Sequence, residues 1–162
     1  MKQLFIIRHA KSSWSLPGQD DFDRPLNDRG RRDAPMMAER LLAKKIDIDL
    51  IVSSPANRAL TTAGFFADAY RLDKTHQKTV RSLYHASPSV FYEVIRSLDD
   101  GFQSVALFSH NPGITAFVNE LSDARIDNMP TCGVFAIRSA IDHWKDFPKR
   151  DNQFWFFDYP KA

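Results

Sequence analysis

The sequence predicts one α/β domain, a three-layer α/β/α sandwich on a mostly parallel central sheet. Short, continuously apolar runs alternate with stretches whose apolar residues recur at helical spacing, which is the pattern of βαβ units. The chain has 162 residues, of which 43% are hydrophobic and 12% aromatic. That length can bury a stable core without disulfides or metals. Since no break in composition marks a second domain, we expect residues 1–162 to form a single domain.

The first half of the chain predicts two strands and two helices. Residues 4–7 are continuously apolar, as expected of a strand covered on both faces, and residues 14–28 have the composition of a polar loop. A helix is expected over about residues 31–44, with Pro35 tolerated near its start.

A second buried strand is expected at residues 50–52, followed by two serines. Ser54 suits the N-cap of a helix and Pro55 its first turn. We therefore expect a second helix from this point to about residue 70.

The second half continues the alternation to the end of the chain. Its expected elements are a strand at 79–80, a helix starting at Ser87 or Ser89 and reaching 98, a strand at 105–108, a helix at 114–121, and late strands at 134–137 and 154–159 around a polar insertion at 142–152.

Charge and cysteine content indicate which partners and which cellular compartment to expect. With 22 basic and 20 acidic residues the net charge is only +2, whereas nucleic-acid-binding proteins usually concentrate basic residues, so no nucleic-acid partner is expected. Cys132 is the only cysteine, which fits a reducing compartment. No apolar run reaches the roughly 18 residues that cross a bilayer, and the first residues do not resemble a signal peptide. We expect a cytoplasmic protein without a membrane partner.

Polar side chains follow several predicted strands directly. Arg8 and His9 follow the first strand, Arg58 lies one turn into the helix after the second, and His110 and Asn111 follow a later one. Because ligands bind at the carboxyl ends of parallel strands, we expect these groups to converge. Two arginines and two histidines beside helix N-termini describe an anion site, and a phosphoryl group is its natural occupant.

Other motifs point to different chemistry and are weaker. A single histidine after a buried strand is more often structural, so only the joint placement is informative. Cys132 and Arg138 have the Cys-x5-Arg spacing of thiol phosphatases, but the residues between them have the pattern of a strand. Asp47 and Asp49 resemble a phosphoaspartate pair, yet they precede a strand instead of following one. The sequence contains neither a P-loop nor the paired histidines of a zinc site.

Several segments resemble the histidine phosphatase superfamily, which has the phosphoglycerate-mutase-like fold. Arg8-His9-Ala10 is similar to its Arg-His-Gly signature, and residues 8–14 resemble the short SixA-type branch of phosphohistidine phosphatases. Further matches follow in order over essentially the whole chain, at residues 23–30, 53–59, 83–86, 109–113 and 129–134.

The resemblance implies a role for each site residue. His9 corresponds to the nucleophile, and the groups that bind the phosphoryl oxygens correspond to Arg8, Arg58 and His110. Substrate-binding positions are expected at Arg24, which looks like an added phosphate ligand of the short branch, and at Ser12, Ser15 and Asn111.

The glutamate that acts as general acid in larger members has no clear counterpart. The chain's only glutamates are Glu39, Glu93 and Glu120, and all three fall inside expected helices. His85 lies near the family position and is a candidate general acid, although a surface role suits it equally well.

The resemblance implies a metal-independent, cofactor-free phosphatase that works through a phosphohistidine intermediate. Without a firm general acid, and without the long helical insertions that enclose the substrate of mutases, the expected substrate is phosphohistidine in a phosphoprotein. Two alternatives stay open. One is a phosphatase of small phosphorylated molecules, and the other is a non-catalytic phosphoprotein-binding module on the same fold, against which the retained His9 argues. The sequence does not indicate the oligomeric state.

Overall fold

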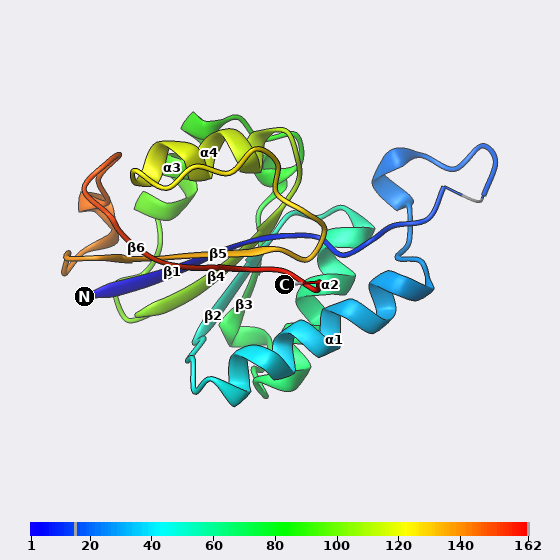
Figure 1. Ribbon diagram of the computed structural model, residues 1–162, viewed down its shortest axis with the longest axis horizontal. Helices are drawn as coiled ribbons and strands as arrows, with labels where there is room; N and C mark the ends of the chain where they lie inside the picture. Colours follow the sequence, from blue (N-terminus) through cyan, green and yellow to red (C-terminus); the bar gives the residue numbers. More distant parts are fainter. Residues whose placement is uncertain (15, 162) are drawn as a thin grey trace.

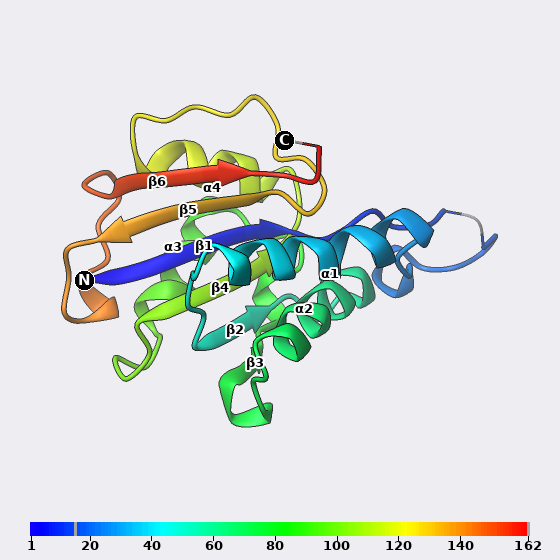
Figure 2. The same cartoon turned by 60° about the horizontal axis from the view of Figure 1, so that its bottom comes forward.

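A computed structural model describes residues 1–14 and 16–161 and confirms the α/β/α sandwich (Figure 1). One six-stranded sheet runs through this part of the chain in the order β3-β2-β4-β1-β5-β6 (Figure 2). Parallel pairs join β1 (Lys2–Arg8) to β4 (Ser104–Ser109), and β2 (Leu50–Ser53) to both β4 and β3 (Gln77–Thr79). The antiparallel pairs are β1 with β5 (Val134–Ser139) and β5 with β6 (Gln153–Asp158). The expected mostly parallel sheet is confirmed.

Helices cover both faces of the sheet. One face carries α1 (Asp28–Ala43) and α2 (Asn57–Ala69), and the other carries α3 (Pro88–Arg96) and α4 (Gly113–Leu121), as Figure 1 shows. None of these helices is long and apolar enough to cross a membrane, nor is any other in residues 1–14 and 16–161.

The continuous apolar run of β1 is explained by the helices that cover both faces of the sheet. Successive side chains of a strand point to opposite faces. Leu4 and Ile6 therefore join the core under α3 and α4, whereas Phe5 and Ile7 join the core under α1 and α2. All four side chains are buried, so the strand has no polar face.

Two helix starts differ from the sequence expectation. α1 begins at Asp28, three residues early, because the Asn27 side chain accepts a hydrogen bond from the Gly30 N–H at 2.9 Å and caps the helix. α2 begins at Asn57, so the expected cap at Ser54 is wrong. The Ser54 hydroxyl instead lies 2.7 Å from Nε2 of His110.

Three further segments differ in detail. The third strand lies at Gln77–Thr79, slightly before its expected place, and the loop at 14–28 contains a 3₁₀ turn at Asp21–Asp23. The insertion expected to be polar contains a 3₁₀ turn at Trp144–Asp146, and Trp144 is fully buried. Its indole N–H donates to the Phe102 carbonyl at 2.9 Å, which satisfies the polar end of the ring.

Two glycines allow backbone segments to meet at the carboxyl edge of the sheet. A Cβ on Gly30 would lie 2.1 Å from the Lys11 carbonyl oxygen, and one on Gly113 would lie 1.9 Å from the Ala86 carbonyl oxygen. The start of α1 is thereby packed on the loop after β1, and the start of α4 on the loop before α3.

Gly30→Ala is expected to destabilise the protein by about 1–3 kcal/mol, since the added methyl collides with backbone that cannot move cheaply. Urea unfolding measures the change. The matched control is Gly64→Ala in α2, where a Cβ meets nothing within 4 Å and alanine should gain about 0.5–1 kcal/mol over glycine. Equal stability of the Gly30→Ala variant and the wild type would contradict this close packing.

Candidate active site

One cavity of about 270 Å³ at the carboxyl edge of the sheet brings most of the expected site residues together. The expected residues among its lining are Arg8, His9, Ser12, Arg24, Arg58, His85, His110 and Asn111. The remaining one, Ser15, lies outside the described residues. The cavity is also lined by Lys11, Trp14, Asp21 and Thr131, which the sequence analysis did not single out.

The segment at the end of β1 is held by backbone contacts from neighbouring loops. The His9 N–H donates to the Ser109 carbonyl at 3.2 Å, and the Cys132 N–H donates to the His9 carbonyl at 3.1 Å. The Ala10 N–H donates to Oγ1 of Thr62 at 2.9 Å, which ties the segment to α2. Hydrogen bonds to the peptide units before and after His9 therefore fix its position.

The hydrogen bond of the His9 ring determines its tautomer. Nδ1 of His9 lies 2.8 Å from the Ala10 carbonyl oxygen. A carbonyl can only accept, so Nδ1 carries the proton and Nε2 keeps its lone pair. Burial, reinforced by the charges of Arg58 and Arg8, lowers the pKa of His9 to about 3, despite the opposing effect of the Ala10 hydrogen bond. The ring is therefore neutral at pH 7 and can act as a nucleophile through Nε2.

The second histidine faces the first. The ring centroids of His9 and His110 are 5.2 Å apart. Nε2 of His110 pairs with the Ser54 hydroxyl, whereas its buried Nδ1 has no hydrogen-bond partner within the described residues. Burial, followed by the neighbouring His9 and Arg58, lowers the pKa of His110 to about 3.

Two of the three arginines converge on one carboxylate, that of Asp21. Arg58 donates from Nη2 to Oδ2 of Asp21 at 2.9 Å, and Arg24 donates from Nε to Oδ1 at 3.1 Å. Arg24 also donates to the Ser12 hydroxyl at 2.6 Å. Arg8 donates from Nη1 to the Met129 carbonyl at 2.8 Å.

Asp21 is the main site residue that sequence reasoning missed. Besides the two arginines, its carboxylate accepts from the Tyr84 hydroxyl at 2.7 Å. Burial alone would raise the pKa of Asp21, but the hydrogen bonds from Tyr84 and Arg58 outweigh it and hold the pKa well below its usual range. The only signal in the sequence is an acidic run immediately before Arg24 in a segment expected to be loop.

Unpaired polar atoms gather at the same place. Six buried side-chain atoms have no hydrogen-bond partner within the described residues, and three of them belong to the cavity: Nε of Arg8, Nε of Arg58 and Nδ1 of His110. Buried polar groups are normally paired. An oxyanion would supply several acceptors at once to a site of this composition.

Comparison with known proteins shows the family to which the chain belongs. The profile of the histidine phosphatase superfamily (branch 1) matches residues 4–86. The chain belongs to this superfamily. It is 31% identical over 153 residues to an uncharacterized protein of Mycobacterium tuberculosis strain H37Rv, covering 86% of this chain and 90% of the relative. It is 27% identical over 135 residues to phosphohistidine phosphatase SixA of Escherichia coli K12, covering 83% of each chain.

Solved structures place the chain near the SixA-type members of the superfamily. The structure of SixA from Agrobacterium tumefaciens superimposes with a TM-score of 0.80 at 26% identity, covering 98% of both chains. The resemblance to this branch is confirmed, and the chain is a hydrolase of the histidine phosphatase type.

The groups considered as alternatives lie in unsuitable surroundings. Cys132 is fully buried, and burial raises the pKa of its thiol, which disfavours the reactive thiolate. Glu39, Glu93 and Glu120 lie within α1, α3 and α4, and none lines the cavity. Nowhere in residues 1–14 and 16–161 do three or more potential metal ligands gather as a metal site would require.

His85, the candidate general acid, lines the cavity and is exposed.

His9 and His110 are expected to stay neutral from pH 8 to pH 5, because their pKa values lie near 3 in the folded protein and near 6.5 in the unfolded chain. The unfolded chain therefore takes up protons first, so the free energy of unfolding should fall as the pH drops below about 6.5. Nitrogen-15 NMR of the imidazole rings checks the charge states. A titration midpoint near 6.5 for either ring would contradict the burial described above.

Asp21→Asn is expected to tighten tungstate binding by roughly tenfold, because it removes a negative charge that competes for Arg24 and Arg58 (a factor of ten is about 1.4 kcal/mol). Calorimetric titration measures the affinity. Asp23→Asn is the matched control, since Asp23 is exposed in the same turn and its carbonyl, not its carboxylate, accepts from Asn57. Unchanged or weaker binding by Asp21→Asn would show that Asp21 does not compete for the site.

Proposed function

We propose that this protein hydrolyses phosphohistidine in phosphoproteins, through a covalent phosphohistidine formed on His9 and without a metal ion. The observation that carries the proposal is the neutral His9 ring, whose Nδ1 is engaged by the Ala10 carbonyl, in one cavity with Arg8, Arg58 and His110. A nucleophile with a fixed lone pair beside several phosphate-binding cations is what phosphoryl transfer to histidine requires.

In the first step, Nε2 of His9 attacks the phosphorus atom in line with the substrate's P–N bond. That bond breaks, its electron pair goes to the leaving imidazole nitrogen, and this nitrogen takes up a proton from water. The transferring group spreads its charge over three oxygens. Arg8, Arg58 and Arg24 stabilise that charge, and Nδ1 of His110 is free to bind one oxygen.

In the second step, water attacks the phosphorus atom and the bond to Nε2 of His9 breaks. Phosphate leaves, and the neutral ring of His9 is restored. While phosphorylated, the ring carries a positive charge, which the Nδ1–H hydrogen bond to the Ala10 carbonyl stabilises. The three arginines supply positive charge in this step as well, so the proposal needs no metal ion.

The leaving group supports phosphohistidine over phosphate esters. The only carboxylate that lines the cavity among the described residues is Asp21, and its low pKa keeps it ionised and unable to donate a proton. The candidate donor that remains is His85, which lines the cavity but is exposed. An alkoxide leaving group needs a firmly held donor, whereas a phosphoramidate needs less assistance. The similarity to Escherichia coli SixA, which is named a phosphohistidine phosphatase, points the same way.

His9→Ala is expected to abolish hydrolysis of a phosphohistidine peptide while tungstate still binds, because the nucleophile is lost and the cations remain. Phosphate release and calorimetry measure the two properties. Cys132→Ser with a chelator present serves as the control and should keep most of the activity, since Cys132 is buried away from in-line attack.

The same assay tests the substrate class. Wild-type protein should turn over a phosphohistidine peptide and phosphoramidate faster than phosphoserine or an alkyl phosphate, by at least about tenfold in kcat/KM (about 1.4 kcal/mol of activation free energy). Faster turnover of the esters would favour the small-molecule phosphatase. Full activity of His9→Ala, or loss of activity with chelator alone, would overturn the mechanism.

A further inference from the structure

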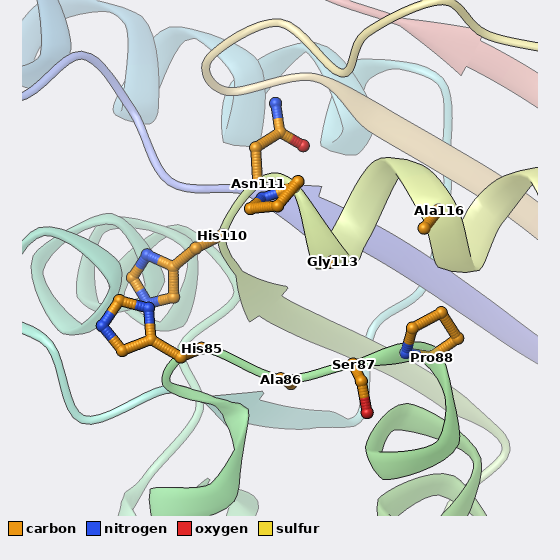
Figure 3. A pocket seen from close by; sticks show the side chains of 9 residues that line it. His85, Ala86, Ser87, Pro88, His110, Asn111, Gly113 and Ala116 are labelled. Atoms are coloured by element: carbon orange, nitrogen blue, oxygen red, sulfur yellow. The ribbon is translucent and has the colours of Figure 1, made fainter.

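A second cavity, of about 360 Å³, opens beside the phosphate-binding cavity. It is a groove between two segments, the one leading into α3 and the one leading into α4 (Figure 3). Its lining residues are His85, Ala86, Ser87 and Pro88 on one side, and His110, Asn111, Pro112, Gly113 and Ala116 on the other. The proposed mechanism does not use this groove.

The groove adjoins the phosphate-binding cavity. His85, His110 and Asn111 line both. Figure 3 shows His85 and His110 toward one end of the groove, whereas Pro88 and Ala116 lie toward the other. A substrate with its phosphoryl group between His9 and the arginines therefore meets the groove directly beyond His110.

Its walls are held in place before any ligand binds. Nδ2 of Asn111 donates to the Met129 carbonyl at 3.0 Å, and Oδ1 accepts from the Thr115 hydroxyl at 2.6 Å. The same Met129 carbonyl accepts from Arg8, so one oxygen positions both cavities. The contact between Gly113 and the Ala86 carbonyl joins the two walls closely. A fixed shape lowers the entropic cost of binding.

The character of the groove favours an apolar group presented from outside. Beyond the two histidines, four of its seven lining residues are alanine or proline. Its rim is exposed at Ser87, Pro112 and Ala116, so a group can enter from the side. Its volume lies near the lower end of the roughly 300–1,000 Å³ typical of ligand pockets, which suits one side chain and not an extended segment.

We propose that this groove is a specificity subsite that receives one apolar side chain of the phosphoprotein substrate, next to its phosphorylated histidine. The inference rests on the function proposed above and adds to it a preference in the substrate's sequence. The phosphoryl group and the apolar side chain would bind together, one in each of the two adjoining cavities. The subsite therefore acts on recognition of the protein substrate and not on transfer of the phosphoryl group.

The test compares phosphohistidine peptides that carry leucine or serine beside the phosphorylated residue, on either side of it. Wild-type protein should favour one leucine peptide over its serine counterpart by at least about tenfold in kcat/KM. Ala116→Gln places a long, uncharged polar side chain in the groove. The kcat/KM values of the two peptides should then differ by no more than about twofold. Phosphoramidate has the same P–N bond and no side chain, so its hydrolysis should change by less than about twofold.

Ala43→Gln is the matched control, because Ala43 is exposed at the end of α1 and lines neither cavity. This substitution should change none of the kcat/KM values. A wild type without preference among the peptides would overturn the subsite. So would an Ala116→Gln variant that loses phosphoramidate activity to the same extent as peptide activity, since the effect would then lie in the phosphate-binding cavity.

Binding separates this inference from the proposed function. We expect 3-phenylpropylphosphonate to bind wild type at least about tenfold more tightly than methylphosphonate, and the difference to disappear in Ala116→Gln. If the protein hydrolysed neither the peptides nor phosphoramidate, the proposed function would fail, and the phosphonate titrations would still decide whether the groove takes an apolar group. Equal affinities for the two phosphonates in wild type would overturn the subsite.

Discussion

The hydrogen bond from Nδ1 of His9 to the Ala10 carbonyl is the contact on which the rest of the site depends. It fixes the tautomer, and with it the nitrogen that carries the lone pair. Ala10 is itself anchored, because its backbone N–H donates to Oγ1 of Thr62 in α2. The hydroxyl of Thr62 donates in turn to the Arg58 carbonyl at 2.8 Å. One chain of hydrogen bonds therefore connects the ring of His9 to the helix turn that carries Arg58.

Asp21 offsets part of the positive charge of the cavity, which also contains three arginines and Lys11. Its carboxylate pairs with Arg24 and Arg58 and keeps these guanidinium groups from facing each other unneutralised. His9 and His110 are neutral, so the positive charges that act on His9 come from the arginines. A phosphoryl group offers the arginines more acceptor oxygens and more negative charge than one carboxylate does. We therefore expect a bound phosphoryl group to compete with Asp21 for Arg24 and Arg58.

Local pattern was sufficient for the fold and for the cavity residues that follow the strands, because both depend on strands with fixed directions. Arg24, Ser12 and His85 were expected only from the resemblance to the family. Parallel strands bring their carboxyl ends to one edge, so residues directly after them, such as His9 and His110, must lie near one another. Contacts between distant segments could not be read in this way. Asp21 reaches the cavity because the loop between β1 and α1 folds back through a bridge between Ser12 and Leu26. Ser54 was misassigned as a cap because its hydroxyl pairs with His110, a residue far away in sequence.

The most direct test of the account is the position of phosphorus on the enzyme during turnover. Protein labelled with nitrogen-15 in its histidines would be mixed with phosphoramidate, quenched in base, where phosphohistidine is stable, and studied by phosphorus–nitrogen correlation NMR. The account predicts a covalent phosphoryl group on Nε2 of His9, since Nδ1 is committed to the Ala10 carbonyl. Phosphorus on Nδ1 of His9, on another residue, or on no residue while substrate is consumed would contradict it.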